Sequence, residues 1–236
     1  MFEGTAVPDV DVVMPCFNAA RYVGAAIASA LEQVPPPARV IVIDDGSTDG
    51  SAGAILRYGA PVEYHRQSNA GISAARNAGA ARARAPFLAF LDADDLWTEG
   101  SLARRMAHLD AHPEDDGVFA ALSQFLSPEL SDALAGRMRF DPDPSVARFA
   151  GTFLVRRASF ERVGPFDESL KVGEMIEWLA RAQSVGLRIG TLADVVLRRR
   201  VHDSNTVLRL GRSPSEYLRA IKGALDRKRQ AGEDGA

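Results

Sequence analysis

Short apolar runs alternate with helical stretches through the first hundred residues, and this alternation restricts the fold more than any other feature. Runs that are rich in β-branched or aromatic residues and bounded by turn residues are typical of buried parallel strands. We expect such strands at 10–14, 40–43, 62–64 and 87–91. The helical stretches between them lie at 20–33, 51–58 and 72–84. This order predicts an α/β fold with a Rossmann-like, mostly parallel sheet flanked by helices.

The second half of the chain is less regular. We expect strands at 117–122, 153–156 and 195–201, and helices at 102–111, 173–185 and 214–229. Residues 123–150 are mixed in pattern and predict a loop-rich insertion. A length of 236 residues suits a single domain. We divide it into a tail at 1–9, a first half at 10–112, a second half at 113–212, and a helix with a frayed end at 213–236.

Composition excludes several classes of protein. The formal net charge is −3, whereas a general nucleic-acid binder would be basic. Cys16 is the only cysteine, so no internal disulfide can form. No apolar run approaches the roughly 20 residues of a transmembrane helix, and the N-terminus lacks the pattern of a signal peptide. We therefore expect a cytoplasmic protein, with peripheral contact at the inner membrane face left open because a lipid-linked acceptor needs no anchor.

The strongest polar cluster follows the run at 87–91, where Asp92, Asp94 and Asp95 come in quick succession. Ligands of parallel α/β sheets bind at the carboxyl ends of the strands. Three carboxylates at such an end repel one another unless a cation or polar partners compensate. Mg²⁺ and Mn²⁺ commonly bridge carboxylates and substrate phosphates, so the cluster predicts a metal site. The alternative is that Asp94 or Asp95 caps a following helix.

A second acidic cluster follows the run at 40–43 and contains Asp45, Gly46 and Ser47. A carboxylate such as Asp45 can accept hydrogen bonds from a base or a ribose. The alternative is an Asx turn into a helix capped by Ser47 or Asp49. Both interpretations remain open at this stage.

A third cluster ends the first strand, at Pro15, Phe17 and Asn18. Pro15 cannot donate to a ladder and so ends the strand. Phe17 can stack on a base, and Asn18 can contact a donor or cap the next helix.

A fourth cluster contains Gly71, Arg76 and Asn77, at the start of the helical stretch 72–84. Free N–H groups after Gly71 favour phosphate. Asn77 can either contact a ligand or tie adjacent loops together.

Together these four segments resemble the family 2 glycosyltransferases, which adopt the GT-A fold. That family has Pro-x-Phe/Tyr-Asn after a strand, Asp-Asp-Gly-Ser, Asn-x-Gly-x-x-x-x-Arg-Asn and Leu-Asp-x-Asp-Asp, and all four occur here in order. The match is strong over 10–112 and weaker over 151–205. By this resemblance, 10–112 is the nucleotide-sugar-binding half and 113–212 is the acceptor-binding half.

The resemblance implies a UDP-, GDP- or dTDP-sugar donor, a divalent Mn²⁺ or Mg²⁺, and inversion at the anomeric carbon. Asp45 would hold the base, with Pro15 and Phe17 lining that pocket. The wider set of donor-binding candidates adds Asn18, Ser47, Gly71, Arg76, Asn77, Asp92 and Asp94. The metal candidates are Asp92, Asp94, Asp95 and His202.

The sequence departs from the family at the catalytic base. In the family, this base is the Asp of a Glu-Asp pair that opens a helix. Here the matching residues are Glu174 and Met175, and a thioether cannot accept a proton at neutral pH. Glu174 can replace the base, Glu177 on the same helix face can do so, or normal transfer activity has been lost. We favour Glu174. A thiol acceptor would lessen the need for a strong base.

The last cluster surrounds His202, which follows the strand-like run at 195–201. A late histidine in related GT-A enzymes often reaches the metal or the diphosphate. On an extended strand, Arg198 and Arg200 would point the same way and clamp phosphate. The alternative is a surface histidine beside a basic edge strand.

Two other functions compete with a glycosyltransferase. A nucleotidyltransferase would lead with a Gly-rich, basic phosphate loop, which residues 10–20 lack. A sugar-nucleotide-binding scaffold that has lost its base is supported by Met175. The acceptor is a glycan, a lipid-linked molecule, a peptide or a small molecule. The short insertion at 123–150 predicts an open acceptor face that a second copy, in a homodimer, would complete.

Overall fold

The computed structural model describes residues 10–130, 140–141 and 143–203, and the predicted helix at 214–229 and both chain ends lie outside them. In this part of the chain, one nine-stranded sheet has the order β3-β2-β1-β4-β8-β6-β9-β5, with β7 paired to β6. The strands are β1 (Val10–Cys16), β2 (Arg39–Asp44), β3 (Val62–Arg66), β4 (Phe87–Phe90), β5 (Leu96–Trp97), β6 (Gly117–Leu126), β7 (Ser145–Val146), β8 (Leu154–Arg156) and β9 (Ile189–Val201). The helices are α1 (Val23–Leu31), α2 (Ser51–Leu56), α3 (Ile72–Ala80), α4 (Ser101–Ala111), α6 (Arg157–Val163) and α7 (Glu174–Ser184), with a 3-10 turn η1 (Ala150–Thr152).

The first half forms the parallel part of the sheet, as the alternation predicted. β1 pairs in parallel with β2 on one side and with β4 on the other, and β2 pairs in parallel with β3. The carboxyl ends of these four strands therefore lie at the same edge of the sheet. The acidic clusters that follow β2 and β4 are brought to that edge, together with the segment that follows β1.

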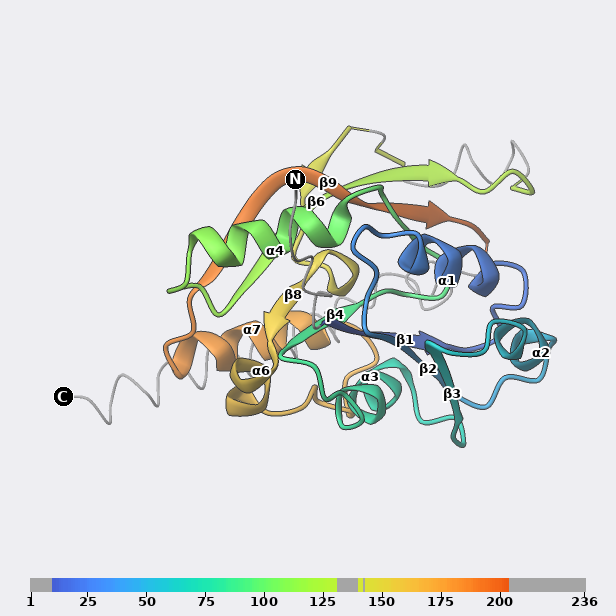
Figure 1. Ribbon diagram of the computed structural model, residues 1–236. Coiled ribbons are helices and arrows are strands. Elements are labelled where there is room, and N and C mark those ends of the chain that lie inside the picture. The colour runs from blue at the N-terminus through green and yellow to red at the C-terminus, as the bar shows by residue number, and fades with distance from the viewer. Residues whose placement is uncertain (1–9, 131–139, 142, 204–236) are drawn as a thin grey trace.

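The sheet is covered by helices on both faces (Figure 1). Alternate side chains of β1 point to opposite faces. Val12 and Met14 pack in a core with residues of α1, α2 and α4. Val13 packs in a second core with residues of α6 and α7, and α3 contacts β1 and β2 on the same face. The predicted fold with helices on both faces is confirmed.

The second half joins the sheet through antiparallel pairs. β8 pairs antiparallel with both β4 and β6, and β9 returns in parallel beside β6 (Figure 1). β9 begins at Ile189, six residues before the predicted strand, because its pairing with β6 starts there across an irregular register. The two-residue strands β5 and β7 have too few residues to show a periodic pattern in the sequence. β7 lies within the predicted loop-rich insertion.

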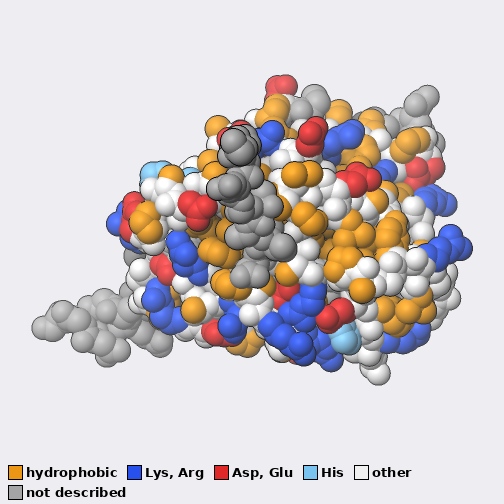
Figure 2. Space-filling view, in the orientation of Figure 1, with side chains coloured by type: hydrophobic (Ala, Val, Ile, Leu, Met, Phe, Trp, Pro, Cys, Tyr) orange, Lys and Arg blue, Asp and Glu red, His pale blue; other side chains and the backbone are white. Residues whose placement is uncertain are grey.

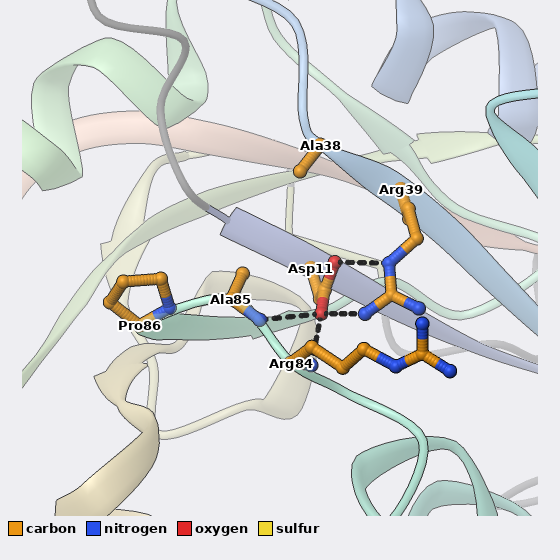
Figure 3. A pocket seen from close by; sticks show the side chains of 6 residues that line it. All are labelled: Asp11, Ala38, Arg39, Arg84, Ala85 and Pro86. Carbon is orange, nitrogen blue, oxygen red and sulfur yellow. Dashed lines mark hydrogen bonds and ion pairs between the residues drawn. The ribbon is translucent and has the colours of Figure 1, made fainter.

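The amino edge of the sheet is closed by internal contacts of a buried carboxylate, that of Asp11. Arg39 donates to both of its oxygens from Nε and Nη2, at 3.0 and 2.5 Å. The backbone N–H groups of Arg84 and Ala85 also donate to Asp11, at 2.6 and 2.9 Å. Figure 3 shows these bonds within a small cavity of about 320 Å³. Because both oxygens of the Asp11 carboxylate accept hydrogen bonds from the protein itself, we assign this cavity a structural role and not a ligand-binding one.

The surface seen in Figure 2 carries charges of both signs, with hydrophobic side chains gathered over α1. No helix within the described ranges is long and apolar enough to cross a bilayer.

Candidate active site

A cavity of about 950 Å³ opens at the carboxyl ends of β1, β2 and β4 and reaches α7 and the end of β9. Its first side is lined by residues that follow those strands or open α3: Pro15, Phe17, Asn18, Asp45, Asn69, Gly71, Arg76, Asp92, Asp94 and Asp95. Its other side is lined by residues of the second half: Arg148, Phe149, Glu168, Lys171, Glu174, Met175, Arg199 and His202. The cavity thus brings together most of the residues that the sequence singled out.

Asp45 organises the loop that leads into α3. Its Oδ1 accepts hydrogen bonds from the side chain of Gln67 at 2.8 Å and from the N–H of Ala70 at 2.9 Å, and its Oδ2 accepts from the N–H of Gly71 at 2.8 Å. The backbone at Gly46 has a φ of +78°, and an added Cβ would lie 3.0 Å from the nitrogen of Asn69, so this close approach requires glycine. Asp45 therefore fixes the wall of the cavity that it also lines.

Asn18 and Ser47 join the loops that follow β1 and β2. The N–H of Asn18 donates to Ser47 Oγ at 2.9 Å, and the N–H of Thr48 donates to Asn18 Oδ1 at 2.8 Å. Ser47 is buried and does not line the cavity, and its own N–H donates to Asp44 Oδ1 at 2.7 Å. An Asx turn does occur in this loop, at Asp49, whose Oδ1 accepts the N–H of Ser51 at 3.0 Å. Phe17 lines the cavity with 48% of its surface exposed, so its ring is available to a ligand.

Arg76 connects the two sides of the cavity. Its guanidinium is 2% exposed and donates to Asp92 Oδ1 through Nη2 and to Glu174 Oε1 through Nη1, each at 2.6 Å. Burial raises the pKa of Asp92, and the charge of Arg76 opposes that rise. Burial acts to lower the pKa of Arg76, but the two carboxylates raise it overall. The link to Glu174, 98 residues away in the chain, has no signal in the sequence.

Asn77 ties α3 to the segment before α7. Its Oδ1 accepts from the N–H of Phe166 at 2.8 Å, and its Nδ2 donates to the carbonyl of Phe166 and to Glu168, both at 2.9 Å. Asn77 is absent from the cavity lining. These contacts favour the structural interpretation over direct contact with a ligand.

Asp94 and His202 meet across the cavity, with Asp94 Oδ2 and His202 Nε2 2.9 Å apart. The ring of Tyr22 lies 4.7 Å from the imidazole and helps to position it. Asp95 is buried and accepts the N–H of Arg200 through Oδ1 at 2.8 Å. Burial, together with Asp94 and Asp92, raises its pKa well above the usual range.

Two of the predicted metal ligands, Asp94 and His202, converge in the cavity. A carboxylate oxygen and an imidazole nitrogen that converge in the cavity are both suitable ligands for Mn²⁺. Asp92 is turned to Arg76 and Asp95 to β9, and no group of three or more His, Cys, Asp or Glu residues that could hold a metal occurs in the described part of the chain. The pair of Asp94 and His202 therefore fits a partial site that phosphate oxygens would complete.

The structure separates the two candidate bases. Glu174 opens α7 and lines the cavity. Glu177 is buried outside the cavity lining, where Arg181 donates to both of its oxygens at 2.9 to 3.1 Å. Met175 is buried and lines the cavity while it packs in the core with Trp178. This arrangement favours Glu174 over Glu177.

The expected phosphate clamp of Arg198 and Arg200 does not line the cavity, whereas Arg199 does. The guanidinium of Arg200 stacks on the rings of Tyr22 and Phe125, at 4.8 and 4.6 Å. Arg200 and His202 do lie together, because Arg200 Nε donates to the carbonyl of Asp94 at 3.0 Å and both side chains lie against the ring of Tyr22. The clamp fails because the Arg200 guanidinium is packed between aromatic rings instead of lining the cavity. Sequence reasoning also missed Arg148 and Lys171, which lie in irregular segments without a motif.

Comparison with known proteins gives the following similarities. A family model described as glycosyl transferase family 2 matches residues 11–164. The chain is 30% identical, over 94% of its length, to a glycosyltransferase of Nostoc sp., of which it covers 73%. It is 31% identical, over 78% of its length, to the succinoglycan biosynthesis protein ExoU of Rhizobium meliloti, of which it covers 59%.

Solved structures are similar in fold. TarS of S. aureus in complex with UDP-GlcNAc aligns with a TM-score of 0.72 at 20% identity over 91% of this chain. The mannosyltransferase PcManGT of Pyrobaculum calidifontis, in complex with GDP-Man and Mn²⁺, aligns with a TM-score of 0.70 at 22% identity over 94% of this chain. The chain spans 65% of the length of each of these two proteins.

Proposed function

The chain belongs to glycosyl transferase family 2 and has the GT-A fold, and from this premise we propose that it transfers a sugar from a nucleoside-diphosphate donor to an acceptor, with inversion. The observation that carries the proposal is the cavity in which Asp94 and His202 converge beside the Arg76 bridge. Support for a nucleotide-sugar donor comes from the complexes of the two structural neighbours with UDP-GlcNAc and GDP-Man.

The donor is proposed to bind on the side of the cavity built by the first half. Phe17 and Pro15 offer apolar surface for the base, and Asp45 lies beside them as an acceptor for its N–H groups. Gly71 opens α3 with a φ of +94°, and its N–H is already bonded to Asp45. The diphosphate would then lie toward Asp94 and the start of α3.

Asp94 and His202 are the residues proposed to hold a divalent cation, Mn²⁺ or Mg²⁺. Asp92 and Asp95 line the same cavity. When bound, such a cation neutralises the charge that develops on the leaving diphosphate. The cation seen with PcManGT is Mn²⁺. Arg76 keeps Asp92 in place next to this group at 2.6 Å.

Glu174 is proposed as the general base. One of its oxygens is bound to Arg76, and no partner of the other is found among the residues that the structure describes. In the transfer step, the acceptor oxygen attacks the anomeric carbon while the bond from that carbon to the diphosphate oxygen breaks. The acceptor proton passes to the carboxylate of Glu174, and the bond electrons leave with the diphosphate.

The test combines donor binding with turnover. UDP-, GDP- and dTDP-sugars are screened by thermal shift with and without Mn²⁺, and release of the nucleoside diphosphate is then measured for the donor that stabilises most. We expect Asp94→Ala to lower turnover by roughly 100-fold or more, while Asp110→Ala, on the exposed face of α4, keeps it.

Three results would argue against the proposal. If no nucleotide sugar stabilises the protein with metal present, the donor assignment is wrong. If Asp94→Ala is as active as wild type, the metal assignment is wrong. Tight donor binding without turnover, to any acceptor tried or to water, favours a sugar-nucleotide-binding scaffold, the alternative that Met175 supports.

A further inference from the structure

Three basic side chains, Arg148, Lys171 and Arg199, line the cavity on its acceptor side. They come from three separate segments: the turn before η1, the loop before α7, and strand β9. None of them forms an ion pair within 4 Å with an acidic side chain in the parts of the chain that the structure describes. Arg148 and Lys171 are exposed, and Arg199 is half-buried.

The acids that share the cavity are engaged elsewhere. Asp92 and Glu174 are both bound to Arg76, and Asp94 is bound to His202. Glu168 accepts a hydrogen bond from Asn77. These acids therefore have hydrogen-bond partners of their own, although they keep negative charge, because Arg76 is a single cation shared by two carboxylates and Asn77 is neutral. Arg148, Lys171 and Arg199 are cations of the cavity wall that lack such a partner within the described residues.

Arg199 is held in a defined place. Its guanidinium lies over the ring of Phe149, 5.2 Å from the centroid, and its backbone pairs with Gln124 of β6. Arg148 is the neighbour of Phe149 in the chain, and both residues line the cavity. Arginine can bind phosphate through two parallel N–H···O bonds, and lysine adds a compact charge.

Lys171 lies three residues before Glu174, the proposed base, and both residues line the cavity. None of the three cations belongs to the segments after β1 and β2 that are proposed to receive the base of the donor. An anion held by them would therefore lie beside the acceptor group that attacks.

We propose that Arg148, Lys171 and Arg199 bind a phosphate group carried by the acceptor, and so select acceptors with a phosphate near the hydroxyl that receives the sugar. This inference rests on the proposed transferase function, because it assigns the second substrate of the same cavity. Phosphate could also be supplied by the donor diphosphate, and the experiment separates the two sources.

The experiment uses the full chain saturated with the nucleoside diphosphate, UDP, GDP or dTDP, that stabilises it most with Mn²⁺. Glycerol 3-phosphate is titrated into it calorimetrically, with glycerol as the neutral matched probe. The variants are Arg148→Gln/Lys171→Gln/Arg199→Gln, the double variant Arg148→Gln/Lys171→Gln with Arg199 intact, and Arg57→Gln as an exposed control away from the cavity. Circular dichroism checks that each variant is folded.

We expect glycerol 3-phosphate to bind the saturated wild type at least tenfold more tightly than glycerol. The triple variant should lose tenfold or more of that affinity and the double variant three- to tenfold, with nucleotide affinity changed less than twofold. Arg57→Gln should match wild type. Binding should weaken as salt is added, because the interaction is between charges.

Two results overturn the proposal. In the first, glycerol 3-phosphate binds the nucleotide-free protein but not the saturated protein, and the triple variant loses nucleotide affinity, which assigns the cations to the donor diphosphate. In the second, the affinity for glycerol 3-phosphate equals that for glycerol or is the same in the triple variant. If no nucleotide binds at all, the donor assignment fails separately, and the same titration on the nucleotide-free protein still tests the cations.

Discussion

The two sides of the cavity are built in different ways. On the donor side, polar groups bond to one another inside the protein: Asp45 holds the loop before α3, and Asn18 and Ser47 hold two loops together. On the acceptor side, Arg148 and Lys171 are exposed and have no acidic partner within the described residues. The difference indicates a preformed donor site beside an acceptor site whose charge is left for a ligand.

The comparison depends on Arg76, whose buried guanidinium joins an acid from each side, and Arg76→Met removes this bridge. Asp92 and Glu174 would lose a buried cation that each contacts at 2.6 Å. Removing one partner of a buried ion pair costs about 3–5 kcal/mol. We expect a fall of this size in the free energy of unfolding, measured by urea denaturation at pH 7.

The control is Arg82→Met, whose exposed side chain bonds to the carbonyl of Ala78 in the preceding turn. It should change the free energy of unfolding by no more than about 0.5 kcal/mol. If Arg76→Met stays within about 1 kcal/mol of wild type, the bridge does not hold the two sides together.

A second substitution tests whether the acceptor side supplies the general base. Glu174→Gln keeps the shape of the side chain but removes the proposed base, so kcat should fall by about 100-fold or more. Glu177→Gln weakens the pair with Arg181 at 2.9 Å and should act on stability instead. Steady-state kinetics with the donor selected above would measure kcat for both variants. An equal loss of kcat in the two variants would reject Glu174 as the base.

The contact between α3 and the segment before α7 gives a smaller effect. Asn77→Ala removes two hydrogen bonds to the backbone of Phe166 and leaves its groups without a partner. Each such loss costs about 1 kcal/mol, so we expect about 2 kcal/mol in total. Asn77→Asp keeps an acceptor for the Phe166 N–H but loses the donor. Its free energy of unfolding should therefore lie between those of wild type and Asn77→Ala. A value for Asn77→Ala equal to that of wild type would show that the clamp is dispensable.

The smallest expected effect is the pH dependence of one hydrogen bond on the donor side, between Tyr64 and Asp44. Tyr64 donates to Asp44 Oδ2 at 2.7 Å. Burial acts to raise the pKa of Asp44, but hydrogen bonds from Ser47 and Tyr64 outweigh it and lower the pKa below 3.8. A lowered pKa in the folded state gives stability that is present above pH 3.8 and is lost as the pH falls through the folded-state value.

Tyr64→Phe should therefore cost about 1.5 kcal/mol at pH 7 and less at pH 3. Urea denaturation across this range measures the difference from wild type. The control is Tyr58→Phe, whose hydroxyl donates to the neutral carbonyl of Gly24 at 2.7 Å, so its cost should not follow the ionisation of Asp44. A cost of Tyr64→Phe that is the same at both pH values would contradict the role of the Asp44 charge.

The same contrast explains how much could be predicted from the sequence. The strands β1, β2 and β4 and the acidic clusters that follow β2 and β4 are local patterns, and all were found at nearly the right residues. The bridge from Arg76 to Glu174 joins residues 98 positions apart, and no local pattern contains it. Arg199 was passed over because the alternation was counted back from His202, which selected Arg198 and Arg200 as the residues facing the cavity.

Local patterns also left alternatives that only packing could separate. Glu174 and Glu177 lie on one helix face, yet Glu177 forms an ion pair with Arg181 while Glu174 lines the cavity. Asn77 was open between ligand contact and a link between loops, and its contacts with Phe166 favour the link.

The Arg76 bridge has a consequence for how this chain can be altered, by evolution or by an engineer. A new acceptor half cannot be joined to the present donor half unless it brings an acid to position 174, because the guanidinium would otherwise face Asp92 alone. In relatives, the residue types at 76, 92 and 174 should therefore change together rather than singly. Chimeras assembled from two such proteins should succeed most often when this trio comes from one parent.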